Sequence, residues 1–199
     1  MKITNTKVYG FDNAIIGMRN PMNSWDKSDS GLDSYGEFLM GNKDNKLAKK
    51  LIKAGSDHRK FLRQIFISAF IEVPRYIWTE FDTYKVSTVR NSCSTMHKLG
   101  ARDLTCNDFQ DGVVIDIVLD RLNELGRLYR EDKKVSILRE MKQILPEGFL
   151  QGATYTMNYE NAMNMYHSRK NHRMSEWSGE GGICEWIENL PMMDEWLNL

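Results

Sequence analysis

The chain has few cysteines, no excess of charge of one sign and no long apolar run. Its three cysteines are odd in number and widely spaced among 199 residues, which argues against a disulfide framework and for a reducing compartment. Lysine plus arginine equals aspartate plus glutamate, at 27 each, so no net field draws the chain toward nucleic acid or an anionic membrane. No apolar run reaches the roughly 20 residues that span a bilayer. We therefore expect a cytoplasmic protein that does not enter the membrane, with nucleic acid disfavoured as a partner.

Several motifs of catalysis and metal binding are also missing. The sequence contains no Walker-type Gly-Lys-Ser/Thr loop and no Gly-x-Gly-x-x-Gly after a strand. His167 and His172 are five residues apart, a spacing that does not place two imidazoles on one helical face. Cys93 and Cys106 lack the short spacing of a zinc knuckle. The sequence therefore predicts no metal site.

The composition that remains is that of an ordinary globular protein. Apolar residues make up 41% of the chain and charged residues 27%, and the length is sufficient for one domain, 1–199, with its own core. Residues 19–46 are rich in Asn, Ser, Asp and Gly, which favours turns and loops. Two interpretations of that segment stay open, an inserted loop or lid that closes over a site and a plain surface excursion.

Hydrophobic patterning predicts a few strands and several long helices. Residues 64–73 are β-branched and aromatic on both faces, as in a strand buried on both sides, and Pro74 suits the first turn of a helix that continues to Phe81. The other expected strands are 2–9 and 153–158, and the other expected helices are 11–18, 45–54, 112–131, 134–145, 160–173 and 183–190. Long helices segregated from a few strands indicate the α+β class.

Polar and basic residues gather in the tract TYKVSTVRNSCSTMH, residues 83–97. Lys85, Arg90 and the hydroxyls of this tract can bind a phosphate or a carboxylate through charge-assisted hydrogen bonds. Cys93 and His97 could instead act as a nucleophile and its base, although their spacing alone is weak support. A polar loop between a helix and the next element is the plain alternative.

A second polar group follows the strand expected at 153–158. On a helix, five of its residues would fall within about a third of the circumference. They are Asn158, Asn161, Ser168, Arg169 and His172. Arg169 offers a planar fork for a carboxylate, a phosphate or a base edge, and the alternative is the solvated outer face of a helix.

These two groups stand where one enzyme family carries its ligand-binding residues. The family motif, Arg-His-Arg-x-x-Ser-x-Asn-x-x-Ser-x-Arg, follows a buried strand and an aromatic helix. Here Thr83-Tyr84-Lys85 replaces Arg-His-Arg, and with one inserted residue Asn91 and Ser94 match the motif Asn and the second Ser. Without the insertion Cys93 takes that Ser position, and the closing Arg is missing in either register. In these respects the chain resembles a divergent flavin-dependent thymidylate synthase.

The resemblance spans about residues 55–175. Downstream of the motif, the spacing from Leu145-Pro146 to the family's Asn and Arg positions agrees without a gap. The residues at the matching positions are Lys142, Asn158, Asn164 and Arg169, with His58 ahead of the strand and loose in register by a residue.

The family resemblance implies an α+β fold with a mixed sheet and long helices, and a homotetramer whose sites are shared between subunits. It also implies a reaction in which FAD relays hydride from NADPH and methylenetetrahydrofolate supplies the carbon that methylates a pyrimidine nucleotide, dUMP, at C5. The residues expected on the flavin side are His58, Lys85, Asn158 and Asn164. The residues expected to contact the nucleotide are Arg90, Asn91, Ser94, Lys142 and Arg169. Arg169 is also the expected catalytic residue, because a guanidinium near the pyrimidine carbonyls stabilises charge that develops there.

The departures from the motif leave two function hypotheses open. Two guanidinium groups are lost from the first triplet and one from the end, and losing one buried charged partner commonly costs about 2–5 kcal/mol of binding. The first hypothesis is a divergent enzyme, a flavin-dependent pyrimidine nucleotide methyltransferase or reductase. The second is a catalytically inactive scaffold that binds a nucleotide or another protein. A phage-encoded factor acting on host proteins would also fit such divergence, although no particular residue supports it.

Overall fold

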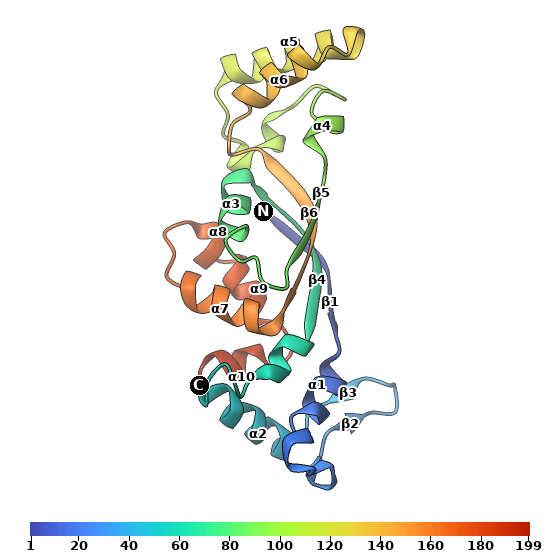
Figure 1. Ribbon diagram of the computed structural model, residues 1–199. Helices are drawn as coiled ribbons and strands as arrows, with labels where there is room; N and C mark the ends of the chain where they lie inside the picture. Colours follow the sequence, from blue (N-terminus) through green and yellow to red (C-terminus); the bar gives the residue numbers. More distant parts are fainter. The chain divides into compact units, whose positions relative to one another are not determined.

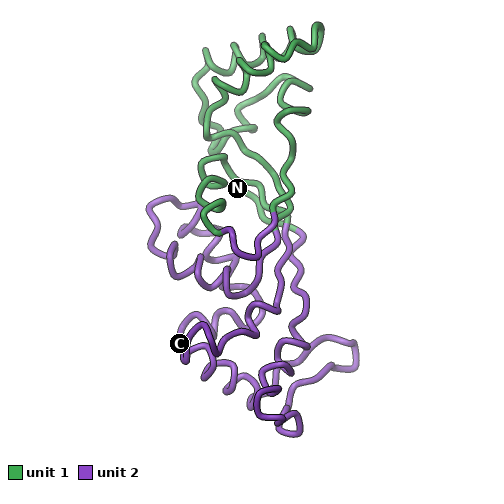
Figure 2. The backbone as a smooth tube through the Cα atoms, viewed as in Figure 1, with its two compact units in different colours: residues 1–4, 70–84, 90–155 green, residues 5–69, 85–89, 156–199 purple.

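The computed structural model describes residues 1–199. Its backbone forms two compact units, coloured separately in Figure 2: unit 1 contains residues 1–4, 70–84 and 90–155, and unit 2 contains residues 5–69, 85–89 and 156–199. The single domain expected over 1–199 stays a prediction.

The largest sheet has four strands in the order β1-β4-β6-β5 (Figure 1). Their bounds are Lys2–Tyr9 for β1, Phe66–Pro74 for β4, Leu150–Asn158 for β6 and Val89–Ser92 for β5. The predicted strand at 2–9 lies at one edge of the sheet. The predicted strand at 64–73 is also confirmed, shifted by one or two residues. The helix and strand content confirms the α+β prediction.

Strand β4 alternates between buried and half-buried residues. Ile67, Ala69 and Ile71 are at most 2% exposed, whereas Ser68 and Glu72, which belong to the alternate positions of the strand, are only partly covered. The expectation of a strand buried on both faces is therefore wrong for one face. The polar side chains at these alternating positions explain the difference, because successive residues of a strand point to opposite faces.

In unit 1, helix α3 (Arg75–Phe81) follows β4 directly and buries three large side chains. Pro74 is its N-cap, one position before the predicted place in the first turn. The other helical elements of unit 1 are α4 (Thr95–Lys98), η4 (Cys106–Asp108), η5 (Gln110–Gly112), α5 (Asp116–Asp132) and α6 (Val135–Ile144).

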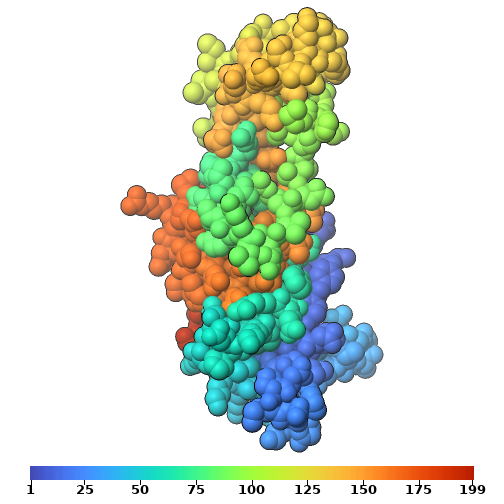
Figure 3. All heavy atoms as spheres, viewed as in Figure 1, coloured from blue at the N-terminus to red at the C-terminus, as the bar shows by residue number.

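Helices α5 and α6 form an antiparallel hairpin and pack side by side, yellow to orange in Figure 3. Lys133 ends α5 with a φ of 53°, and α6 begins two residues later. Apolar residues at helical spacing on both helices share a core cluster, Leu99, Leu104, Phe109, Leu122, Leu125, Met141 and Leu145. The helix predicted from residue 112 begins only at Asp116, because Asp111 (φ 54°) and Gly112 (φ 70°) have left-handed backbones that end the short η5 turn.

Unit 2 is mostly helical. Its elements are α1 (Phe11–Gly17), η1 (Asn20–Met22), η2 (Trp25–Lys27), β2 (Gly31–Leu32), β3 (Phe38–Leu39), α2 (Asn42–Lys53), η3 (Lys60–Gln64), α7 (Tyr159–Arg169), α8 (Ser175–Ser178), α9 (Ile183–Glu188) and α10 (Met193–Leu197). Trp196 stacks on Phe11 with ring centroids 5.9 Å apart and meets Phe61 edge-on at 5.7 Å. Tyr159 is fully buried, its hydroxyl donates to the Pro191 carbonyl at 3.1 Å, and burial raises the pKa of its phenol.

Further element predictions need correction. Helix α2 begins at Asn42 instead of residue 45, helix α7 ends at Arg169 instead of residue 173, and strand β6 begins three residues before the expected 153. Residues 89–92 form a strand inside the polar tract 83–97, for which a loop was one of the alternatives. Residues 179–182 connect α8 to α9 without regular structure. None of the helices combines the length and apolar character that a membrane crossing requires.

Candidate functional site

The first turn of α7 gathers two of the residues expected on the flavin side. Asn158, at the end of β6, is 3% exposed, and its side-chain oxygen accepts from the Asn161 backbone N–H at 2.9 Å, which is an N-cap contact. The Asn161 side-chain amide donates to the carbonyl of Val86. Lys85 precedes Val86 in the chain, so the backbone that carries Lys85 lies beside the start of α7.

Two arginines from the segment before β4 meet the same helix. Arg59 Nε lies 2.9 Å from Glu160 Oε1, and Arg63 Nε lies 2.5 Å from Glu160 Oε2. Burial favours the neutral carboxyl, but the hydrogen bonds from Arg63 and Arg59 outweigh it and lower the pKa of Glu160. Arg59 Nη2 also donates to Asn164 Oδ1 at 3.4 Å. Asn164 therefore lies one turn beyond Glu160, on the face of α7 that Arg59 contacts.

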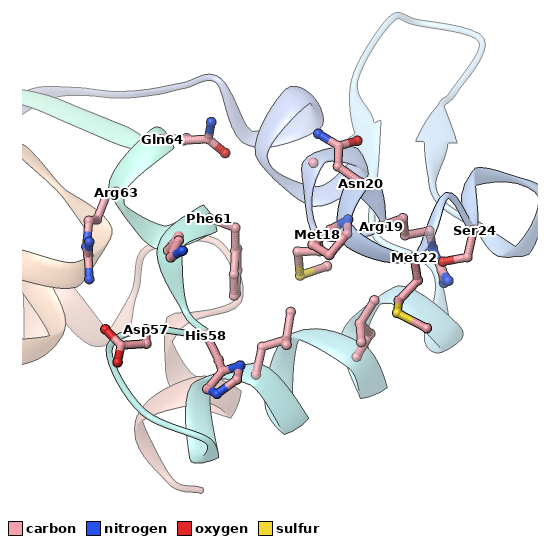
Figure 4. A pocket seen from close by; sticks show the side chains of 15 residues that line it. Met18, Arg19, Asn20, Met22, Ser24, Asp57, His58, Phe61, Arg63 and Gln64 are labelled. Carbon is pink, nitrogen blue, oxygen red and sulfur yellow. The ribbon is translucent and has the colours of Figure 1, made fainter.

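His58, the remaining flavin-side residue, lines a separate cavity of unit 2 with a volume of about 960 Å³. Figure 4 shows His58 and Phe61 on one side of this cavity and Met18 and Met22 on the other. Its lining combines apolar side chains with polar ones, and its volume is within the range of small-molecule and cofactor sites. Arg63, which contacts Glu160 on α7, also lines this cavity, and His58 is the chain neighbour of Arg59.

One wall of this cavity comes from residues 19–24, the start of the segment read as a loop or lid. Arg19 is 6% exposed and Asp44, on α2, is fully buried, and Arg19 Nη2 lies 2.5 Å from Asp44 Oδ1. The other carboxylate oxygen accepts from the hydroxyls of Ser28 and Ser30 at 2.7 Å each. These contacts tie both ends of residues 19–30 to the start of α2. A lid role for the whole segment stays a prediction.

The pKa of Asp44 reflects this set of contacts. Burial favours the neutral acid and by itself would raise the pKa of Asp44. The hydrogen bonds from Ser28, Ser30 and Arg19 outweigh burial, so the pKa of Asp44 is lowered. The carboxylate is charged at neutral pH and fully bonded. It can therefore fix the cavity wall without leaving an unpaired buried charge.

In unit 1, strand β5 carries Arg90 and Asn91, two residues expected to contact a nucleotide. The Arg90 guanidinium lies 5.0 Å above the centroid of the Trp78 ring and its Nη2 lies 3.2 Å from Asp82 Oδ2. Trp78 is 2% exposed and donates from Nε1 to the Gln151 carbonyl at 2.7 Å. Arg90 therefore has a fixed support, and Asn91 beside it is exposed.

Ser94 and Lys142 meet through the short helix α4. The Ser94 hydroxyl caps α4 by accepting from the His97 N–H at 3.3 Å, and Ser94 lines a cavity of about 440 Å³ in unit 1. Lys142 Nζ, on α6, lies 3.1 Å from Met96 Sδ. Four of the five residues expected to contact the nucleotide therefore lie on β5 or next to α4. They are Arg90, Asn91, Ser94 and Lys142.

Arg169 lies at the opposite end of α7 from Asn158. The helix has 11 residues, so its two ends are about 16 Å apart. The guanidinium of Arg169 lies 5.1 Å above the Trp177 ring. Arg169 is therefore not part of the polar group at the first turn of α7.

The predicted polar stripe is wrong as a single helical face. Asn158 is the N-cap of α7 and His172 lies beyond its last residue. Past the helix end the chain turns, and His172 Nδ1 accepts from the Met174 N–H at 3.2 Å. No group of three or more His, Cys, Asp or Glu residues has a geometry that could hold a metal ion.

Several residues that support these groups were missed at the sequence level. They are Asp44, Arg59, Arg63, Trp78, Glu160 and Trp177. The i, i+4 spacing of Arg59 and Arg63, and an acidic residue in the first turn of a predicted helix, were usable signals of a charged contact. The two tryptophans gave no signal, because only tertiary structure brings each ring under an arginine.

Comparison with solved structures identifies the fold. Crystal structures of flavin dependent thymidylate synthase ThyX from Helicobacter pylori, complexed with FAD and dUMP, match 99% of this chain and 97% of theirs, with TM-scores of 0.71 and 0.73 and 16% identity. The UMP/dUMP methylase PolB from Streptomyces cacaoi, bound with 5-Br dUMP, matches 99% of this chain and 95% of its own, with a TM-score of 0.62 and 14% identity. No family model and no curated protein matches the sequence. The expected flavin-dependent thymidylate synthase fold is confirmed.

Proposed function

We propose that this chain binds a pyrimidine deoxynucleotide together with FAD and modifies the pyrimidine at C5. One observation carries the proposal: over 99% of the chain the fold follows two proteins, one whose structures contain FAD and dUMP and one whose structure contains 5-Br dUMP. Within that fold, most of the residues expected from the sequence lie in two groups, one at the start of α7 and one along β5 and α4, while His58 and Arg169 lie outside both groups.

The residues present fit a flavin dinucleotide. Lys85 supplies a cation for a phosphate, and the Asn158 and Asn164 amides lie along one half of α7. The cavity that His58 lines has an apolar interior with Met18 and Phe61, which suits a planar ring system. FAD, when bound, supplies hydride transfer. The chain's own residues bind and orient it and exclude water from the ring.

The proposed nucleotide-binding roles rest on the charge and the hydrogen-bonding groups of each side chain. Lys142 neutralises a phosphate as a point charge, and Ser94 and Asn91 provide hydrogen bonds. Arg90 and Arg169 offer planar donors, and Arg169 stabilises charge that develops on the pyrimidine carbonyl oxygens. NADPH as reductant, methylenetetrahydrofolate as carbon donor and a homotetrameric assembly belong to this proposal in its full form.

The proposal is tested by the visible spectrum and by calorimetric titration with dUMP. We expect a flavin absorption band in the protein supplied with FAD, and dUMP binding that Arg169→Ala weakens by about 30-fold or more, as expected for loss of a half-buried charged donor. Arg173→Ala, which removes an exposed cation just beyond the same helix, is the matched control and should bind normally. A protein that remains colourless with FAD and ignores dUMP would refute the proposal.

A second candidate function is a scaffold that binds the nucleotide without transforming it. The Thr83 hydroxyl, in the position of a family arginine, donates to the Glu80 carbonyl at 2.7 Å, which favours a structural role for that residue. Release of tritium from [5-³H]dUMP in the presence of the full set of cosubstrates separates the two functions. Release that depends on Arg169 supports the enzyme, and binding without release supports the scaffold.

A further inference from the structure

Arg169 is held on an aromatic ring that lies outside its own helix. Trp177, on α8, is fully buried, and the Arg169 guanidinium carbon lies 5.1 Å from its ring centroid. His172 also meets this indole, with its ring at 67° to the indole plane and centroids 6.3 Å apart. The guanidinium therefore rests on a ring that is itself enclosed by protein.

The backbone between Arg169 and Trp177 is folded back by its own hydrogen bonds. The Ser178 hydroxyl donates to the His172 carbonyl at 2.6 Å, and the Trp177 N–H donates to the Met174 carbonyl at 3.1 Å. These bonds join α8 to the turn that follows α7. The position of the ring under the guanidinium is thus set by the chain and does not depend on a ligand.

The same arrangement occurs independently in unit 1. Arg90 lies 5.0 Å above the ring of Trp78, and that ring is fixed by its hydrogen bond to Gln151 at 2.7 Å. Both arginines named from the sequence as nucleotide-binding residues therefore rest on buried tryptophans. Lys142 has no planar group to orient, and its contact with Met96 involves no aromatic ring.

A guanidinium over an indole face is attracted by the ring quadrupole, and the stack restricts the plane of its N–H donors. A planar fork that is already oriented loses less conformational freedom when it binds two oxygen atoms. We propose that Trp177 is a positioning residue for Arg169, which it holds in the orientation that binds oxygen atoms of the pyrimidine nucleotide. This inference rests on the proposed function, and it assigns Trp177 no contact with the substrate.

The experiment compares Trp177→Leu, Trp177→Phe, Arg169→Lys and the double variant Trp177→Leu/Arg169→Lys. Trp186→Leu is the matched control, because that indole belongs to the same unit and donates to Thr6 Oγ1 at 3.0 Å. Folding of each variant is checked by thermal melting. If Trp177→Leu does not fold, Trp177→Phe, which keeps an aromatic face, is measured in its place.

The first readout needs no ligand. In the wild-type protein, ring current should shift the Arg169 Nε–H proton upfield in a ¹H–¹⁵N spectrum, with Arg169→Lys used to assign the signal. Trp177→Leu should abolish that shift and Trp186→Leu should leave it. An Arg169 Nε–H at an ordinary position in the wild type would overturn the proposal whether or not the protein binds nucleotide.

The second readout is affinity for dUMP, deoxyuridine and inorganic phosphate. We expect Trp177→Leu to weaken dUMP binding about fivefold to thirtyfold, the range of a partly desolvated cation–π contact, and Trp177→Phe to recover part of it. The loss should be absent in the Arg169→Lys background, because the two residues act as one unit. If Trp177→Leu also weakens the binding of deoxyuridine, Arg169 binds the base oxygens. If Trp177→Leu instead weakens the binding of inorganic phosphate, Arg169 binds the phosphate of the nucleotide.

The outcomes separate this inference from the function it rests on. If the wild type binds dUMP and Trp177→Leu binds it equally well, the positioning role is wrong and the proposed function stands. If Trp177→Leu weakens binding to the same extent in the Arg169→Lys background, the ring acts through general stability and the positioning role is also wrong. If the wild type binds no dUMP, both fail.

Discussion

At the scale of single residues, Arg19 and Asp44 form the most completely buried ion pair of the chain, with side chains 6% and 0% exposed. Both charges have left water, so their stability depends on the pairing and on the added hydrogen bonds to the carboxylate. Arg19 also lines the cavity that contains His58. A change at Asp44 should therefore affect folding and that cavity together.

Asp44→Asn should lower the free energy of unfolding by about 3–5 kcal/mol, because it leaves the Arg19 guanidinium buried without a counter-charge. Urea unfolding measures the effect. Asp26→Asn removes an exposed carboxylate in the same segment and should change stability by less than about 0.5 kcal/mol. If Asp44→Asn and Asp26→Asn lowered the free energy of unfolding equally, the buried ion pair would stabilise the protein no more than an exposed carboxylate does.

The lowered pKa values of Asp44 and Glu160 predict acid sensitivity. A carboxyl whose pKa is lower in the folded state contributes stability above its ordinary pKa, and that contribution is lost as pH falls toward the folded value. The loss should therefore begin near the ordinary values of 3.8 for Asp44 and 4.5 for Glu160. Melting temperature measured against pH should fall more steeply below this region in the wild type than in Asp44→Asn/Glu160→Gln. Parallel curves would contradict the assignment.

At the scale of elements, the contact between β4 and β6 depends on one glycine. A Cβ atom added at Gly152 would lie 2.4 Å from Phe70 Cζ, far inside van der Waals contact. The Gly152 carbonyl also accepts from the Cys93 N–H at 2.8 Å, so the backbone has little freedom to move away. The glycine is required here for close approach.

Gly152→Ala should therefore destabilise the protein by about 1–3 kcal/mol, the usual cost of overpacking. The measurement is urea unfolding of Gly152→Ala, Phe70→Leu and the double variant. Removing the ring should make room for the methyl group, so the double variant should be more stable than the sum of the single losses predicts. Strict additivity would mean that the strain lies elsewhere.

The elements that the sequence predicted well are those with a strong apolar period. Helices α3 and α6 repeat buried side chains at helical spacing, and β4 places buried residues at every second position. Strand β5 has the sequence VRNS with all four residues exposed, so no apolar alternation marks it. Its conformation comes from pairing with β6, which is a tertiary effect that patterning does not contain.

The candidate site was predictable to the same extent. Capping residues such as Asn158 and Ser94 act on neighbours three residues away, and their types alone indicate the role. The contact of Arg59 with Glu160 joins residues 101 positions apart, and the Arg169 stack depends on the turn that follows α7. Such long-range contacts depend on the fold, and single-residue patterns carry no information about them.

At the scale of the whole molecule, the fold persists although identity to the ThyX structures is only 16%. Buried positions tolerate exchange among apolar residues of similar volume, whereas ligand contacts need particular groups. We therefore expect the difference between the family's Arg-His-Arg and Thr83-Tyr84-Lys85 here to affect ligand binding more than folding. The cations Arg90, Lys142 and Arg169 add support to the proposal of a nucleotide ligand, which rests on the fold.

The most direct test of the central claim is a titration of the FAD-supplied protein with dUMP, followed in the visible flavin spectrum and by calorimetry. The proposed function predicts a protein-bound flavin band that dUMP perturbs, with saturable heat of binding that Arg169→Ala weakens and Arg173→Ala does not. A protein that acquires no flavin band and shows no heat with dUMP would contradict it.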